Sequence, residues 1–159
     1  MKKSLLVIVA FVALAFTSNA QPYKNAVGLS FMPDYSGSAH GIELQWNHFF
    51  TEKTNLDIRA GYILDWGPEL LGMYEWNFPI NDSFRFYAGP GVHFGYTKVE
   101  KETFTNFGFT GAIGIEYVFS GAPIAISLDW RPYLTWTPKV DNKAVFAYKG
   151  IQIGVKYCF

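Results

Sequence analysis

The chain has 159 residues, of which 50% are hydrophobic and 19% aromatic, and it carries 13 basic and 13 acidic side chains. The length suits a single domain, and the even charge balance argues against a nucleic-acid partner, which would require a basic patch. After residue 20 no stretch is continuously apolar for 18 residues, which excludes a membrane-spanning helix there.

The first twenty residues have the features of a cleaved secretory signal peptide. Lys2 and Lys3 precede an apolar run over residues 5–16, and Ala20 ends a group of small residues of the kind that a signal peptidase recognises. The run is too short to cross about 30 Å of hydrocarbon as a helix, and no Cys follows it, which excludes lipoprotein processing. Cleavage after Ala20 leaves one domain over residues 21–159, with two lysines fewer and a net charge of about −2.

Residues 21–159 alternate between apolar and polar side chains, which is the period of a β-strand. Clusters of Gly, Pro, Asp, Asn and Ser separate eight such stretches. In chain order the predicted strands cover residues 25–32, 40–49, 55–64, 69–78, 84–96, 106–119, 123–134 and 144–159. The pattern predicts an all-β domain of eight antiparallel strands.

The two faces of these strands differ in chemistry. One face is apolar and rich in aromatic residues, as Phe84, Phe86 and Phe94 illustrate. The other face also carries His93 and nearly every charge found within a strand. These charged residues are Glu43, Asp57, Arg59, Glu75, Arg85, Glu116, Asp129, Arg131 and Lys156.

Alternation alone does not say which face points outward, and a secreted soluble barrel of the lipocalin kind would turn the apolar face inward around a ligand. Ten of the fifteen glycines lie on the charged face, although glycine weakens a strand on a soluble surface. Glycine suits a narrow lumen, where side chains crowd the axis. Aromatic residues at strand ends are typical of the girdles of membrane barrels, and they are too bulky for an eight-stranded interior. We therefore predict an eight-stranded, antiparallel, up-and-down transmembrane β-barrel with its charges in the lumen.

The nine lumen charges are expected to neutralise one another. Five acids face four bases, as groups withdrawn from water require. Hairpin registers predict that Glu75 lies opposite or diagonal to Arg85, and that Arg59 lies diagonal to Glu43. Because eight strands leave room for side chains but not for a water column, the pattern predicts a closed lumen without sustained ion conductance.

The orientation follows if both termini are periplasmic. Residues 50–54, 79–83 and 120–122 then form periplasmic turns, and residues 33–39, 65–68, 97–105 and 135–143 form external connections. No external connection exceeds about nine residues, which is short for this class of barrel. The external connections mix lysines with acids, so both a solvated rim and a lysine-mediated contact with lipopolysaccharide remain open.

Three segments resemble a known family. They are Phe-Tyr-Ala-Gly-Pro-Gly-Val at 86–92, Gly-Ile-Glu-Tyr at 114–117 and Ile-Ser-Leu-Asp-Trp-Arg-Pro at 126–132. They resemble the small porin-like outer-membrane β-barrel domain family, which is similar in architecture to OmpX- and OmpA-type barrels. The resemblance implies the outer membrane of a diderm bacterium and a monomer in contact with outer-membrane lipid and lipopolysaccharide. It says little about activity, because fold does not determine function.

The C-terminal strand agrees with this resemblance. Its apolar residues recur at every second position and end on a C-terminal aromatic, as in the last strand of an outer-membrane barrel. They are Ile151, Ile153, Val155, Tyr157 and Phe159. The resemblance implies that Tyr157 and Phe159 form the signal that the barrel-insertion machinery reads.

Three function classes follow. The favoured one is a structural or surface-interaction protein without catalysis. The second is a transport path for a small or apolar solute, as OmpW-like barrels suggest, and the third is a lipid A-modifying enzyme.

The enzyme class requires a His, a Ser and a carboxylate within hydrogen-bond reach of one another near the outer leaflet. One group of suitable residues lies at the first external connection, although Ser and Asp are also ordinary turn residues. It consists of Asp34, Ser36, Ser38 and His40. His93 shares the lumen face with Ser127 and Asp129, but a filled barrel offers lipid no route to them. We therefore expect no catalytic residues.

Cofactors and metals are not expected either. His40, His48 and His93 lie on different strands without metal-ligand spacing, and no glycine-rich sequence of the phosphate-binding kind precedes a helix. Cys158 is the single cysteine, so it cannot form an internal disulfide. It is either a small side chain near a strand end or half of an intermolecular disulfide.

Overall fold

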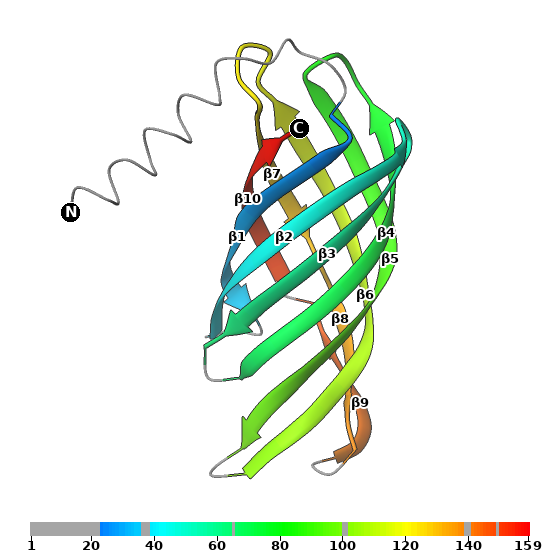
Figure 1. The fold of residues 1–159 in the computed structure, drawn as a ribbon. Coiled ribbons are helices and arrows are strands. Elements are labelled where there is room, and N and C mark those ends of the chain that lie inside the picture. Colours follow the sequence, from blue (N-terminus) through cyan, green and yellow to red (C-terminus); the bar gives the residue numbers. More distant parts are fainter. Residues whose placement is uncertain (1–22, 36–38, 65, 100–101, 139–140, 149) are drawn as a thin grey trace, which may run out of the picture.

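The computed structural model describes residues 23–35, 39–64, 66–99, 102–138, 141–148 and 150–159 (Figure 1). The predicted signal peptide and its cleavage site lie outside these residues. No helix in the described part is long and apolar enough to cross a membrane.

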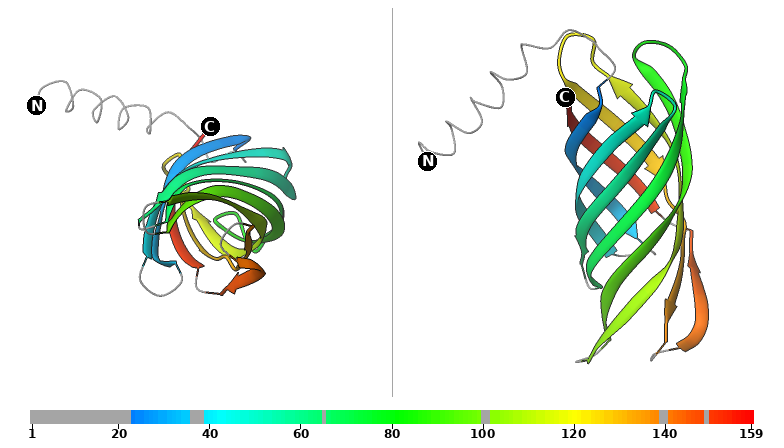
Figure 2. Two further views of the ribbon diagram at one scale, coloured as in Figure 1. Left: turned by 90° about the horizontal axis from the view of Figure 1, so that it is seen from below. Right: turned by 45° about the vertical axis from the view of Figure 1, so that its right-hand side comes forward.

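The described chain consists of β-strands joined by short turns. The strands are β1 (Asn25–Tyr35), β2 (Ala39–Thr51), β3 (Thr54–Ile63), β4 (Gly67–Pro79), β5 (Phe84–Val99), β6 (Glu102–Val118), β7 (Ile124–Trp130), β8 (Tyr133–Thr137), β9 (Asp141–Ala147) and β10 (Gly150–Cys158). All pairings are antiparallel, and the pairing of β1 with β10 closes the sheet into a barrel. The end-on view in Figure 2 shows the closed ring of strands.

Two of the eight strand positions around the barrel are each occupied by two shorter strands, one by β7 and β8 and the other by β9 and β10. β7 and β8 pair with β6 in one continuous register, from Ile113 opposite Trp130 to Thr110 opposite Tyr133. Pro132 separates them because it has no N–H to donate to the ladder. β9 pairs with β8, and β10 pairs with β7. The register of the second pairing is shifted by one residue relative to the first, as a β-bulge produces. The prediction of an eight-stranded antiparallel barrel is therefore confirmed.

The barrel is apolar outside and polar inside, as the glycine and aromatic distribution predicted. Leu44 on the outer face is 61% exposed, whereas Asp57 and Arg131 on the inner face are 0% exposed. The lumen is also crowded where glycine was expected. A Cβ at Gly114 would lie 2.5 Å from the Tyr87 ring, so no larger residue fits there without displacing the tyrosine.

Both described termini lie at one end of the barrel, here called the terminal end, and the opposite end is the far end (Figure 1). The three turns at the terminal end fall where they were predicted, at residues 52–53, 80–83 and 119–123.

The far end departs from the prediction. Residues 97–105 were expected to form an external connection, but β5 and β6 stay paired as far as Val99 opposite Glu102. Most of residues 135–143 likewise belong to β8 and β9. Thr and Phe residues within these polar segments favour a strand, and a partner strand satisfies their backbone groups. Figure 2 shows the two hairpins extending beyond the rest of the barrel. We call residues 96–99, 102–109, 133–137 and 141–147 the protruding sheet.

Candidate functional site in the lumen

All nine predicted charged residues project into the lumen. Eight are buried, and the ninth, Arg85, has a side chain that is 16% exposed. They divide into a central layer, a terminal layer and one residue, Glu75, that belongs to neither.

The central layer consists of Glu43, Asp57, Arg59, Asp129 and Arg131. Arg59 lies at its centre, with Nε 2.8 Å from Asp57 Oδ2, Nη1 3.5 Å from Glu43 Oε2 and Nη2 3.4 Å from Asp129 Oδ2. Arg131 Nη2 lies 3.1 Å from Asp129 Oδ1, and its Nη1 lies 3.7 Å from Glu43 Oε2. Two guanidinium groups thus share three carboxylates. Arg59 and Glu43 are diagonal neighbours across β2 and β3, as the hairpin register predicted.

Neutral side chains complete the hydrogen bonds of the central layer. Arg59 Nη1 donates to Gln152 Oε1 at 2.7 Å and to Ser30 Oγ at 3.2 Å. Tyr87 donates its hydroxyl proton to Asp129 Oδ2 at 2.8 Å. Such partners are what a buried ion pair needs to offset the cost of leaving water.

The terminal layer consists of Tyr23, Arg85, Glu116 and Lys156. Glu116 accepts from Arg85 Nε at 2.6 Å and from the Tyr23 hydroxyl at 2.5 Å, and it also forms an ion pair with Lys156. The Arg85 guanidinium lies 4.5 Å from the Tyr23 ring centroid and 4.6 Å from that of Phe49, within the range of cation–π attraction. In this layer two cations depend on one carboxylate.

The predicted pairing of Glu75 with Arg85 is wrong. Pro79 lies directly opposite Arg85 in the β4–β5 hairpin, so Glu75 is four residues farther along its strand, about 13 Å away. Arg85 instead lies directly opposite Glu116 on β6. Glu75 accepts one hydrogen bond, from Asn55 Nδ2 at 2.9 Å. No ion pair joins it to any residue in the described part of the chain.

Several polar groups of the lumen were not predicted from the sequence, among them the acid Glu69 and the hydroxyl of Tyr23. Glu69 is half-buried near the far end of β4, and it shares the inward parity of Glu75, so the alternation could have identified it. Tyr23 precedes the first strand, and no periodicity in the sequence marks it as a partner of Glu116.

Apolar clusters fill the lumen between and beyond the charged layers. Tyr23, Ala26, Phe49, Ala125 and Cys158 pack together at the terminal end. Other clusters are formed by Leu71, Met73, Tyr87 and Ala112, and by Met32, Ile63 and Tyr133. The Cys158 thiol is free and buried, an environment that suits a small packing side chain better than an intermolecular disulfide.

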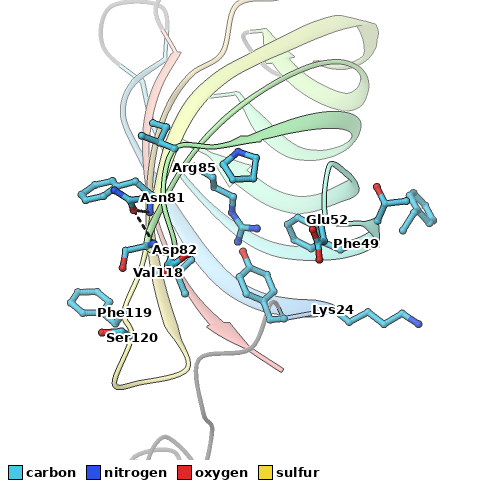
Figure 3. A pocket seen from close by; sticks show the side chains of 16 residues that line it. Lys24, Phe49, Glu52, Asn81, Asp82, Arg85, Val118, Phe119 and Ser120 are labelled. Atoms are coloured by element: carbon cyan, nitrogen blue, oxygen red, sulfur yellow. Dashed lines mark hydrogen bonds between the residues drawn. The ribbon is translucent and has the colours of Figure 1, made fainter.

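A cavity of about 600 Å³ lies at the terminal end (Figure 3). Its lining is partly apolar, with Phe49, Val118 and Phe119, and it includes the charged residues Lys24 and Arg85. Arg85 belongs both to this cavity and to the terminal layer, so the cavity reaches the outermost of the lumen's charged groups.

The residues considered for catalysis are only partly described, and those that are described have other partners. His40 donates from Nδ1 to the Pro33 carbonyl, while Ser36, Ser38 and the side chain of Asp34 lie outside the described part of the structure. His93 contacts Thr135 Oγ1 at 3.2 Å and the Tyr133 ring at a centroid distance of 5.2 Å. The carboxylate of Asp129 is engaged by Arg59, Arg131 and Tyr87. No cluster of three or more His, Cys, Asp or Glu side chains suited to a metal occurs among the described residues.

The comparison with protein families agrees with this geometry. The model of the outer membrane protein beta-barrel domain matches residues 27–159. The chain belongs to this family. A solved structure from the de novo design of transmembrane β-barrels is similar in fold, with a TM-score of 0.62 and 13% sequence identity over 89% of this chain and 100% of the other. No curated protein matches the chain.

Membership of the outer membrane protein beta-barrel domain family places the apolar outer face against lipid. It does not test the predicted insertion signal. Phe159 is 58% exposed at the end of the chain, and its ring stacks on Tyr157 at a centroid distance of 6.1 Å. Recognition of these two residues by the insertion machinery remains a prediction.

Proposed function

We propose that the protein is a non-conducting outer-membrane barrel with a structural or surface-interaction role and no catalytic activity. The filled lumen is the observation that carries this proposal. Two layers of ion-paired side chains and three apolar clusters occupy the space through which a solute would pass.

The protruding sheet supports an interaction role at the cell surface. With the terminal end in the periplasm, this sheet extends outward from the membrane. Among the described strands β9 pairs with β8 alone, and β5 has no β4 partner beyond Gly95. Free strand edges present backbone donors and acceptors that another chain can pair with. Val145 and Phe146, on opposite faces of β9, are 56% and 60% exposed.

Complementation of a deletion strain tests this role. The double variant Val145→Lys and Phe146→Lys places charges on both faces of the β9 edge, and Glu52→Lys in the β2–β3 turn is the matched control at the terminal end. We expect wild type and control to restore envelope resistance to detergent and the β9 variant to fail, with equal amounts of folded barrel by heat-modifiable gel mobility. Full restoration by the β9 variant would leave only a structural role.

Transport of a small apolar solute is the second candidate, because the cavity at the terminal end offers a partly apolar entrance. This path meets the terminal layer at Arg85 and has no described continuation beyond it. The enzyme alternative predicts a change in lipid A mass when the wild-type protein is expressed. We expect the mass spectra of lipid A to be identical with and without expression.

A further inference from the structure

We propose that the lumen binds one alkali-metal cation through side-chain oxygens of Glu75, Asp57 and Asn47. The side chains that form the site project into the lumen from β2, β3 and β4, which run side by side. It is separate from the cavity at the terminal end, whose lining includes none of these three residues.

Glu75 is the first reason for this proposal. Glu75 is 3% exposed, yet among the described residues its carboxylate accepts a single hydrogen bond, from the neutral amide of Asn55. Arg59 and Lys156 act on it only from beyond ion-pair distance. An ionised carboxylate removed from water requires a positive partner. Every other predicted lumen acid has an arginine or lysine within ion-pair distance.

The charges of the lumen also leave one positive charge to be supplied. The terminal layer has two bases for one acid, the central layer has two bases for three acids, and Glu75 adds one more acid. The nine residues therefore sum to one negative charge. Glu69 is a further lumen acid, but it lies six residues from Glu75 along β4, about 20 Å away. The uncompensated charge next to Glu75 is therefore a single negative charge, which one monovalent cation balances.

Three buried oxygens point to the position of the cation. Asn47 Oδ1, Asp57 Oδ1 and Glu75 Oε1 are buried, and none has a hydrogen-bond partner among the described residues. Asn47 lies directly opposite Asp57 across β2 and β3, and Asn55 lies directly opposite Glu75 across β3 and β4. Asp57 is two residues from Asn55 on the same face, which makes it the diagonal neighbour of Glu75, within reach of a long side chain.

The remaining oxygens of both carboxylates are already held in place. Asp57 Oδ2 accepts from Arg59 Nε at 2.8 Å, and Glu75 Oε2 accepts from Asn55 Nδ2 at 2.9 Å. Asn55 Oδ1 in turn accepts from Asn77 Nδ2 at 2.5 Å. These bonds orient the two carboxylates and leave one oxygen of each for a ligand.

A metal cation accounts for these observations better than a proton or a water molecule does. All three oxygens are acceptors, and oxygen is the donor that hard cations prefer. A proton on Glu75 would supply the missing charge but could bridge to one acceptor only, leaving the third oxygen without a partner. A water molecule would donate two hydrogen bonds but would bring no charge.

The test compares unfolding of the mature barrel in lipid vesicles in sodium chloride and in choline chloride at equal ionic strength. Choline is too large to enter the site. A ligand that binds the folded state alone raises its stability with ligand concentration, so we expect the urea midpoint of the wild type to rise with sodium. Glu75→Gln should lose this dependence, and Glu69→Gln, which neutralises a different lumen acid, should keep it.

Asn47→Ala serves as a second variant if Glu75→Gln fails to fold, because it removes a neutral ligand and leaves every charge in place. It should weaken the sodium dependence, and ²³Na line broadening on the folded wild type should be reduced in the variant. Equal wild-type midpoints in the two salts would overturn the proposal. It would also be overturned by a midpoint that responds to pH but not to sodium, since a proton would then be the bound cation, or by a sodium dependence that survives Glu75→Gln.

Discussion

The central and terminal layers combine acids and bases in opposite proportions. In the central layer Arg59 and Arg131 share Glu43, Asp57 and Asp129, and both arginines are fully buried. In the terminal layer Arg85 and Lys156 share Glu116 alone. The central layer therefore keeps a carboxylate for each cation if one acid is lost, whereas the terminal layer depends on a single residue.

The largest effect is expected for Glu116→Gln. The substitution leaves Lys156 buried and Arg85 mostly buried without a carboxylate, and breaking a buried ion pair from one side costs about 3 to 5 kcal/mol. The free energy of unfolding in lipid vesicles, measured with urea, checks this value. Because Arg85 is partly exposed, we place the expected value toward the lower end of that range.

Ile115→Arg tests whether this sensitivity belongs to the lumen side of the wall. Ile115 is adjacent to Glu116 in the chain but faces outward and is 40% exposed. An arginine there meets hydrocarbon and should cost about 2 to 4 kcal/mol. Thr110→Ser on the lumen face is the control and should cost little, since Ser retains the hydroxyl that donates to the Pro132 carbonyl at 2.9 Å. Equal unfolding free energies for the two variants would mean that the inner and outer faces are reversed.

Glu43→Gln provides the central counterpart of Glu116→Gln. Arg59 keeps Asp57 at 2.8 Å and Arg131 keeps Asp129 at 3.1 Å, both closer than their contacts with Glu43. The loss should be that of a charge-assisted hydrogen bond, about 1 to 2 kcal/mol. Urea unfolding of the two variants side by side is the measurement, and an equal loss in both would remove the contrast between the layers.

Arg85→Lys is expected to have the smallest effect. Lysine keeps the positive charge beside Glu116 but loses the guanidinium that lies over the rings of Tyr23 and Phe49, a cation–π contact worth about 0.5 to 1 kcal/mol at a partly exposed site. Urea unfolding in lipid vesicles measures the difference in unfolding free energy between this variant and the wild type. A loss as large as that of Glu116→Gln would show that the arginine, rather than the carboxylate, holds the terminal layer together.

The sequence was sufficient to predict the strands, their faces and the identity of the lumen charges, because a period of two assigns each residue to one side of the sheet. The partner of Glu75 was not predictable in the same way. Its position relative to Arg85 depends on which residues the β4–β5 turn leaves unpaired, and the composition of residues 79–83 does not specify this. The sequence pattern predicted shorter strands than β5 and β6, because charged residues such as Lys98 and Glu102 are more common in loops than in strands.

Conductance of the purified wild-type barrel in a planar lipid bilayer tests the closed lumen most directly. The ion-paired layers and the apolar clusters predict no sustained current at any applied voltage that the bilayer tolerates. Stable channels of a single size would contradict a closed lumen, and they would favour the transport candidate over the structural and surface-interaction role.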